Sequence, residues 1–355
     1  MMKLCKKLII FLSLFIFLSC ALAAKPVSVI LMIGDGMGFE QIKAADYYFY
    51  GEEGRLSFES FPVKGSVTTY SADNDITDSA AAATAMATGQ KVNNGVISKA
   101  IPGDGSNLVT LLKRAQQDGK STGIVTTTMV THATPAAFAS HNLSRNNYAE
   151  IAADIFTVTK PNVVMGGGGP SAGIVTADVN SAGYNIAQNS TELRGLTGEL
   201  ACGFFGDGHM PYEYDGLGDY PHLNQMAVKA LDLLDTSPAG FFLMIEGGRI
   251  DHACHSNDLV RAVYEVKEFS DTVQVVLDWM GSRDDVLLIV TADHETGGLS
   301  VTSNNGVDVL PTVTWSTDYH TAADVPLYAF GAGSELFSGK MDNTDIYDLI
   351  LLQAF

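Results

Sequence analysis

Short apolar runs alternate with amphipathic stretches along the chain, and this pattern predicts the fold. The apolar runs are rich in Val and Ile and lie at residues 27–33, 123–128, 162–169, 241–245, 286–292 and 325–331. Because they are continuous rather than alternating, they are typical of strands that are covered on both faces. Stretches with helical spacing, such as 107–120 and 258–280, lie between them. The sequence therefore predicts an α/β fold, a three-layer α/β/α sandwich with a large, mostly parallel central sheet.

The composition fits a globular protein. Of the 355 residues, 46% are hydrophobic and 17% are charged, which is too few charges for a disordered chain. No repeat, low-complexity linker or internal boundary is visible beyond the N-terminal leader. We therefore expect residues 25–355 to form a single domain.

Residues 1–24, MMKLCKKLIIFLSLFIFLSCALAA, have the pattern of a signal peptide. Three lysines precede an apolar stretch that ends in small residues. This pattern predicts a periplasmic or secreted bacterial protein with no stable membrane span. Two alternatives stay open. One is a membrane anchor, which needs about 20 uninterrupted apolar residues. The other is a lipid anchor at Cys20, since FLSC at 17–20 resembles a lipoprotein processing site.

Acidic side chains dominate the mature chain. The sequence holds 21 basic and 40 acidic residues, and loss of the three leader lysines leaves 18 against 40, a formal charge of −22. So negative a surface should not bind nucleic acid or anionic membranes non-specifically. Two cysteines remain, Cys202 and Cys254, and the sequence does not decide whether they form a disulfide.

Oxygen and nitrogen donors follow four of the predicted strands. They are Asp35, His132, Thr134, Glu246, Asp293 and His294. A single acid after a strand is usually only a helix cap or a turn residue. Ligands in open α/β sheets bind beyond the carboxyl ends of the strands, however, and four such strands would bring their donors to one edge. The sequence therefore predicts a binding site at this edge.

The segment FFLMIEGGRIDHACHSND, residues 241–258, adds two more donors. Asp251 and His255 are four residues apart, so on a helix they share a face and can hold one ion. Imidazole in a ligand set suits zinc, whereas an all-oxygen set suits magnesium. Cys254 could be a soft ligand but lies off that face, so a buried thiol or a disulfide partner is the preferred interpretation.

The segment DITDSAAAATAMATGQK, residues 75–91, supplies a candidate nucleophile. Asp78 and Ser79 precede an alanine-rich run that should be helical. The simplest interpretation is that they cap this helix. The alternative is that Ser79 points from the positive end of the helix toward metal ions, where an alkoxide or a phosphoserine would be stabilised.

Taken together, these segments resemble the alkaline phosphatase family. The motifs, in the family's own order, are ILMIGDGMG (30–38), TDSAAAATAMATGQK (77–91), THATPAAFASH (131–141), IEGGRIDHACHSND (245–258), TADHETGG (291–298) and a late His320 in WSTDYHTAADVPLYAFG. Six motifs in order make the resemblance specific. It implies a single catalytic domain at 25–355 that hydrolyses small-molecule phosphate monoesters with two Zn²⁺ ions and one Mg²⁺ ion.

The resemblance also implies a role for each site residue. Ser79 would be the nucleophile, and Arg145, in HNLSRNNY, would clamp two phosphate oxygens. The first zinc would be bound by Asp251, His255 and His320. The second would be bound by Asp35, Asp293, His294 and Ser79, and the magnesium by Asp35, Thr134 and Glu246. His132 and His252 would lie just outside these ligands and tune the magnesium site and the bound phosphate.

The implied reaction has two steps. Ser79 attacks phosphorus to give a phosphoserine, and water then releases inorganic phosphate, while the metal ions and Arg145 make the site positive within an acidic protein. Only residues 299–319 separate the TADHETGG motif from His320, which indicates a compact form without a large accessory lobe. Family members usually form homodimers, and the short segment leaves a monomer open.

Two other classes of protein remain as rivals. A sulfatase or phosphodiesterase of the same wider superfamily would share the fold and the metals. A formylglycine sulfatase needs Pro and Arg after its modified residue, however, and Ser79 is followed by four alanines. A phosphodiesterase usually has Thr as its nucleophile. A secreted zinc- or phosphate-binding protein would have no use for Ser79.

Overall fold

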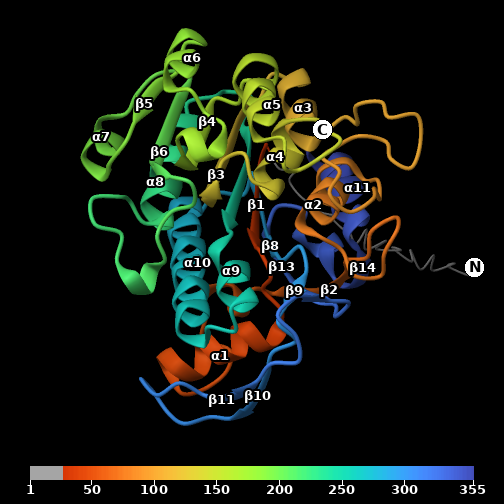
Figure 1. Cartoon of the computed structure of the whole chain (residues 1–355), viewed down its shortest axis with the longest axis vertical. Coiled ribbons are helices and arrows are strands. Elements are labelled where there is room, and N and C mark those ends of the chain that lie inside the picture. Colours follow the sequence, from red (N-terminus) through yellow and green to blue (C-terminus); the bar gives the residue numbers. More distant parts are fainter. Residues whose placement is uncertain (1–26) are drawn as a thin grey trace, which may run out of the picture.

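A sheet of ten strands runs through the computed structural model, which describes residues 27–355 (Figure 1). Its strands are β1 Ser28–Gly34, β2 Val63–Thr68, β3 Ser121–Met129, β4 Val163–Gly168, β5 Asn185–Ala187, β6 Ala201–Asp207, β7 Phe241–Gly247, β8 Val286–Thr291, β13 Val325–Gly331 and β14 Gly339–Asp342. Their order across the sheet is β14-β2-β13-β8-β1-β7-β3-β4-β6-β5. The predicted signal peptide and Cys20 lie outside the described residues.

Helices cover both faces of this sheet. They are α1 Phe39–Tyr50, α2 Ser79–Thr88, α3 Leu111–Gln117, α4 Ala133–Ala139, α5 Tyr148–Ala153, α6 Thr176–Ser181, α7 Ser190–Gly195, α8 Leu223–Leu234, α9 Arg249–His255, α10 Leu259–Met280 and α11 Asn343–Ala354. Helices α1, α8 and α10 pack on one face, and α2, α4 and α11 pack on the other (Figure 1). The predicted three-layer α/β/α sandwich is confirmed. Among residues 27–355, no helix has both the length and the apolar character needed to cross a membrane.

All six predicted strands are present, and the sheet is mostly parallel. The exception is β13, which is antiparallel to both β2 and β8. Because β13 is reversed, it begins at the edge where β8 ends, and His320 just before it is brought to that edge. The apolar pattern missed β2, β5, β6 and β14. Glycine or polar residues interrupt these strands, as in VKGSVT and GKMD.

Two short antiparallel strand pairs lie outside the main sheet, in the segment between β8 and β13. The pair β9 Glu295–Thr296 with β12 His320–Thr321 is antiparallel, and so is the pair β10 Ser300–Ser303 with β11 Thr312–Thr314. The β9–β12 pair places His320 opposite Thr296. The short 299–319 segment is therefore a hairpin that returns the chain to the end of β8.

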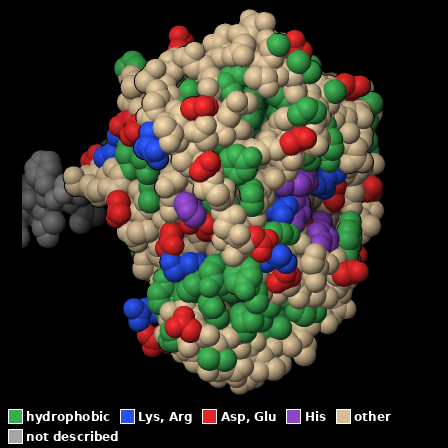
Figure 2. Space-filling view, turned by 60° about the vertical axis from the view of Figure 1, so that its left-hand side comes forward, with side chains coloured by type: hydrophobic (Ala, Val, Ile, Leu, Met, Phe, Trp, Pro, Cys, Tyr) green, Lys and Arg blue, Asp and Glu red, His purple; other side chains and the backbone are tan. Residues whose placement is uncertain are grey.

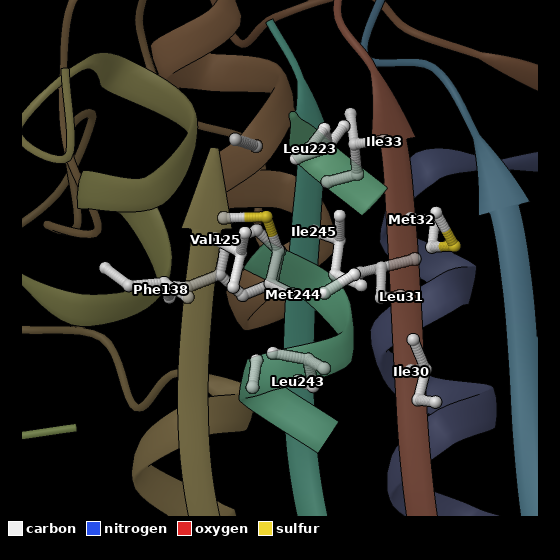
Figure 3. Close-up of a cluster of buried hydrophobic side chains, with 14 of the residues drawn as sticks. Ile30, Leu31, Met32, Ile33, Val125, Phe138, Leu223, Leu243, Met244 and Ile245 are labelled. Carbon is white, nitrogen blue, oxygen red and sulfur yellow. The ribbon is translucent and has the colours of Figure 1, made fainter. Parts of the chain in front are cut away.

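The centre of the sheet is buried on both faces, which explains the continuous apolar runs. Every residue of β1 and of β7 is buried. Leu31 of β1 lies beside Met244 of β7, and Ile245 of β7 lies beside Val125 of β3, within this core (Figure 3). Full burial of one such side chain contributes about 1.5–3 kcal/mol. This tightly packed centre fixes the ends of the strands, where the site is built.

Helix α2 is buried on all sides, which is why it is rich in alanine. All ten of its residues are buried, and the small side chains let it pack against α4 and α11. Asp78 caps its start by accepting a hydrogen bond from the backbone N–H of Ala81 (3.0 Å). Gly89 ends the helix in the left-handed conformation, with φ 71°. The predicted cap is confirmed, and it fixes Ser79 at the first helical position.

Candidate active site

The predicted donors meet at one edge of the sheet. Strands β8, β1, β7 and β3 are neighbours at the centre of the sheet and run in parallel. Asp35 follows β1, Glu246 lies near the end of β7, and Asp293 follows β8. All three carboxylates are completely buried. The structure therefore brings together the side chains that the sequence placed after separate strands.

One group of donors surrounds the hydroxyl of Ser79. His294 Nε2 lies 3.2 Å from Ser79 Oγ, 3.2 Å from Asp293 Oδ2 and 3.5 Å from Asp35 Oδ1. The donor atoms of Asp35, Asp293 and His294 lie within 4.8 Å of one another, so one metal ion could contact all three. Asp293 Oδ1 accepts hydrogen bonds from the backbone N–H groups of His294 (2.9 Å) and Gly36 (3.1 Å). These bonds fix the carboxylate and leave Oδ2 directed at the group.

A second group of donors forms around Asp251. Asp251 Oδ1 lies 3.3 Å from His255 Nε2, one turn along α9, and 3.5 Å from His320 Nε2. The two imidazole Nε2 atoms are 3.1 Å apart. Burial opposes ionisation of Asp251, but hydrogen bonds from His255 and His320 hold its pKa well below the usual value. The same hydrogen bond raises the pKa of His255 to about 9. The predicted sharing of one helix face by Asp251 and His255 is confirmed.

Backbone carbonyls orient the two histidines of this group. His255 Nδ1 donates a hydrogen bond to the carbonyl of Asp318 (2.6 Å), and His320 Nδ1 donates to the carbonyl of Thr77 (2.8 Å). Because carbonyl oxygens only accept, the proton of each ring lies on Nδ1. Nε2 can also carry a proton and donate it to Asp251. A metal ion would displace that proton and bind the Nε2 lone pair, which is the usual arrangement for metal-binding histidine.

Thr296 links the two donor groups. Its hydroxyl donates to Asp251 Oδ1 (2.5 Å) and accepts from His294 Nδ1 (3.2 Å), so His294 also keeps its Nε2 lone pair free. Space is tight here. A Cβ atom at Gly36 would lie 2.8 Å from Thr296 Oγ1 and 2.9 Å from Asp251 Cα, and Gly36 has φ +74°. Only glycine lets the turn after β1 pass this close to both donor groups.

A third group contains Glu246 and is held by β3. Glu246 Oε2 accepts hydrogen bonds from the hydroxyls of Thr126 and Thr128, the latter at 3.1 Å. The two threonines are two residues apart on one strand, so they point to the same face. Burial, opposed by these hydrogen bonds, raises the pKa of Glu246 to about 7. Its other oxygen, Oε1, faces the site without a hydrogen-bond partner.

The structure places His132 closer to this third group than the resemblance implied. The donor atoms of His132, Asp35 and Glu246 lie within 4.8 Å of one another, although His132 was expected just outside the ligands. Thr134, two residues further on in α4, is also buried, and its hydroxyl has no partner. His132 is the N-cap residue of α4, so the start of that helix brings both side chains toward the acids.

These acidic groups lack enough positive charge and enough hydrogen-bond partners. The buried side-chain atoms without a partner include Asp35 Oδ1 and Oδ2, Thr134 Oγ1, Glu246 Oε1 and Asp293 Oδ2. Such atoms are rare in folded proteins and costly to leave unpaired. Burial and the negative charge of Asp293 raise the pKa of Asp35 well above its usual value. Metal cations would remove both penalties, so the residues present fit the metal ions that the resemblance implies.

Arg145 is held at the start of α2 by Asp78, the residue that caps this helix and precedes Ser79. Its Nη1 donates to Asp78 Oδ2 (2.9 Å), and its Nη2 donates to His132 Nε2 (3.3 Å). Asp78 therefore has two functions, since it caps the helix and orients the guanidinium. The sequence indicated only the first. A fixed guanidinium beside a nucleophile is suited to two oxygens of a phosphoryl group.

Several residues of the site were missed by sequence analysis. They are Thr126, Thr128, Thr296, His209 and Arg249. The spacing of the first two along an apolar strand could have indicated them, whereas no local pattern marks His209 in the loop after β6. The structure shows the state of the two cysteines. Cys202 in β6 and Cys254 in α9 are both buried and free. The disulfide alternative is therefore wrong, and the buried-thiol interpretation of Cys254 is confirmed.

The fold and the site define a class of protein. A buried set of carboxylates and imidazoles, a serine at a helix start and a fixed arginine are typical of a metal-dependent hydrolase that acts on a phosphoryl group. The profile of the family described as alkaline phosphatase matches residues 27–172 and 169–312. The chain belongs to the alkaline phosphatase family, and it is an enzyme of the metal-dependent phosphomonoesterase class.

Individual relatives agree with this assignment. Alkaline phosphatase 3 of Bacillus subtilis is 32% identical over 90% of this chain and 87% of its own length. The solved alkaline phosphatase of the Antarctic bacterium TAB5 is 30% identical with a TM-score of 0.83, covering 94% of this chain and 98% of that one. The cold-active enzyme of Shewanella sp. is 31% identical with a TM-score of 0.85, covering 92% and 100%. A histidine-to-aspartate variant of the TAB5 enzyme was solved with magnesium in a site named M3.

Proposed function

We propose that the protein hydrolyses phosphate monoesters through a phosphoserine on Ser79, with two zinc ions and one magnesium ion. The observation that carries this proposal is the position of Ser79. Its hydroxyl lies at the start of α2, 3.2 Å from His294 Nε2 and beside the guanidinium anchored by Asp78. A serine that only capped the helix would not need to face a metal-binding histidine, because Asp78 already caps it.

The three donor groups would each hold one ion. We assign the first zinc to Asp251, His255 and His320. The second zinc is assigned to Asp35, Asp293 and His294, next to Ser79, and the magnesium to Asp35, Thr134 and Glu246, with His132 beside it. His252 and His132 would tune the bound phosphate and the magnesium site. When bound, the ions would lower the pKa of the serine hydroxyl and of a water molecule, and neutralise charge on the leaving oxygen.

The chain's own residues would bind and orient the phosphoryl group. Arg145 pairs with two of its oxygens, and Asp78 keeps the guanidinium from rotating away. The N-terminus of α2 adds a favourable dipole next to the phosphoryl group. Ser79 Oγ forms a bond to phosphorus while the ester oxygen leaves as an alcohol. Water then breaks the Ser79–phosphorus bond, which releases inorganic phosphate and restores the serine hydroxyl.

We further propose that residues 25–355 act as one catalytic domain after export to the periplasm or the medium, as a homodimer or a monomer. The leader pattern at residues 1–24 supports export. The relatives support one domain, because the match to each covers most of both chains.

The decisive experiment compares the wild type with Ser79→Ala. Phosphate release from an aryl phosphomonoester would be measured at alkaline pH before chelation, after chelation, and after zinc and magnesium are restored, with the matching diester alongside. We expect the monoester to be much the better substrate and the chelated enzyme to be inactive until metal returns. Ser79→Ala should be slower by about 10³-fold or more. A faster diester, or a fully active Ser79→Ala, would contradict the proposal.

A further inference from the structure

Five side chains form a basic rim beside the donor groups. They are His132, Arg145, His209, Arg249 and His252. The ring centroid of His209 lies 4.5 Å from that of His252 and 5.2 Å from that of His132. Figure 2 shows histidines and basic side chains gathered together on one face of the molecule. The proposed reaction makes no use of His209 or Arg249.

Hydrogen bonds decide which nitrogens of the rim histidines carry protons. The backbone N–H of Met129 donates to His209 Nδ1 at 3.2 Å. Arg249 Nη1 donates to His252 Nδ1 at 2.9 Å, since a guanidinium can only donate. A nitrogen that accepts a hydrogen bond has no proton, so in both neutral rings the proton lies on Nε2. Burial, reinforced by the positive charge of Arg249, lowers the pKa of His209 to about 3, so this ring stays neutral.

His132 presents a third N–H group in the same way. Its Nε2 accepts from Arg145 Nη2 at 3.3 Å, so its proton lies on Nδ1, which is buried and has no partner. The three rim histidines therefore offer three N–H donors and no free lone pair.

This arrangement favours an anion over a metal ion at the rim. The rings of His132, His209 and His252 are close enough together to hold a metal. Binding one would require each ring to give up the hydrogen bond that it accepts, because a metal needs a lone pair while the other nitrogen keeps the proton. An anionic oxygen needs only donors. The rim already supplies imidazole N–H groups and two guanidinium groups.

Arg249 is the rim residue best suited to an anion from a ligand. It is largely buried and stacks on the ring of Tyr212, 3.8 Å from the ring centroid. Its Nε is buried without a hydrogen-bond partner, and within residues 27–355 no carboxylate lies within 4.0 Å of its guanidinium. Arg261 contacts the same ring at 5.1 Å but pairs with Asp215 and Asp258. A partly buried guanidinium that pairs with no carboxylate among residues 27–355 is suited to an anion supplied by a ligand.

We propose that Arg249, His209 and His252 bind a second anionic group of the substrate, a carboxylate or a second phosphate. This rests on the proposed function, in which Arg145 at the other end of the rim binds the scissile phosphoryl group. Because His132 and His252 lie between Arg145 and Arg249, one small molecule can contact both arginines. The preferred substrates are then phosphate monoesters with a second anionic oxygen group a few bonds from the ester oxygen.

The test compares matched pairs of substrates that differ only in that charge. Phosphoglycolate would be compared with its uncharged amide, and the bisphosphate of 1,3-propanediol with the corresponding monophosphate. The ratio of kcat/KM, anionic over neutral, would be measured for the wild type and for Arg249→Gln and His209→Gln. We expect the wild type to prefer the anionic member of at least one pair. Arg249→Gln should lower that ratio by about 10- to 100-fold, and His209→Gln should lower it less.

Arg261→Gln is the matched control, because it removes an arginine from the same tyrosine without touching the rim. It should leave the ratio unchanged. If Arg249→Gln lowers kcat/KM equally for both members of each pair, Arg249 only supports the structure and the proposal is wrong. The same holds if the wild type shows no preference in either pair. Metal analysis adds a second test, since loss of a bound metal ion in His209→Gln would show that the rim binds a cation.

This experiment also separates the subsite from the proposed function. The uncharged amide and the monophosphate report on phosphomonoester hydrolysis alone. If the wild type hydrolyses neither, the proposed function fails. If it hydrolyses both and the ratio does not respond to Arg249→Gln, only the subsite fails.

Discussion

Two sets of histidines lie side by side in this site and differ in which nitrogen carries the proton. One set is His255, His294 and His320, and the other is His132, His209 and His252. Each ring of the first set donates through Nδ1 to an oxygen, so its Nε2 lone pair faces the carboxylates. Each ring of the second set accepts from an arginine or a backbone N–H, so its remaining nitrogen donates. Histidine is thus arranged to bind a cation in the first set and to donate hydrogen bonds to an anion in the second.

The two sets also differ in the elements that support them. In the first set, His294 follows the central strand β8 and His320 lies in the β9–β12 pair, while His255 ends α9. The rim is built from the loop after β6, the loop before α5 and the start of α4, together with α9. Loops adapt more readily than strand ends. On this comparison, the proposed metal site would be the more firmly held part and the rim the more adaptable one, and the rim's basic groups would let an acidic protein of formal charge −19 bind an anion.

Asp35→Asn should have the largest effect, because Asp35 belongs to two of the donor groups. We expect kcat on a phosphomonoester to fall by about 10³-fold and the metal content, measured by elemental analysis, to fall with it. The metal-free variant should melt at a higher temperature than the metal-free wild type. The pKa of Asp35 is raised, so its ionisation costs stability as pH rises through that pKa, and the amide removes this cost.

The advantage of the Asp35→Asn variant should vanish at low pH, where Asp35 is protonated in both the folded and the unfolded wild type. Asp232→Asn, at an exposed position of α8, is the control and should change neither activity nor metal content. Full metal content in Asp35→Asn would contradict the prediction that the donor groups around Asp35 bind metal ions.

Thr296→Val should have an intermediate effect, since it breaks the hydrogen-bond relay from His294 to Asp251. The valine keeps the shape but cannot accept from His294 Nδ1, so the tautomer is no longer fixed. We expect zinc affinity to weaken by about 10-fold, measured by competition with a chromogenic chelator. Thr296→Ser keeps the hydroxyl and should bind zinc like the wild type. Equal affinity in the valine variant would mean that tautomer control does not distinguish the two sets of histidines.

Glu265→Gln should have the smallest effect on activity. It tests the effect of burying a carboxylate on stability, apart from any metal binding. Glu265 is buried in α10, accepts a hydrogen bond from the backbone N–H of Glu213 (2.8 Å), and has its pKa raised to about 8 by burial. Its neutral form therefore favours folding. This contribution is complete below the unfolded pKa of 4.5 and is lost as pH rises through about 8.

The glutamine variant should accordingly be more stable than the wild type at pH 9, by roughly 2 kcal/mol, and equal to it at pH 4. Urea unfolding at the two pH values would measure the difference. Because Glu265 lies outside the donor groups, added zinc should not alter this gap. A gap that zinc removes would mean that Glu265 is coupled to the metal site after all.

Much of the fold could be predicted from local patterns. Continuous apolar runs gave the six buried strands because both faces of those strands are covered, and helical spacing over 258–280 indicated α10. The strands that were missed contain glycine or polar residues, so their pairing depends on neighbours in the sheet rather than on their own pattern. The antiparallel direction of β13 could not be predicted either, since an apolar run does not show which way its strand runs in the sheet.

The site divides in the same way. The sequence by itself indicated the candidate donors and the candidate nucleophile, because Asp35, Glu246 and Asp293 come at the ends of recognisable strands and Ser79 begins a helix. Only the tertiary structure decided which nitrogen of each histidine carries a proton, which acids share a group, and that Arg249 pairs with no acid among residues 27–355. These properties depend on hydrogen bonds and charges between residues far apart in the chain, such as Met129 with His209 and His320 with Thr77. Such contacts form only when the strands assemble, so no local pattern of residues can record them.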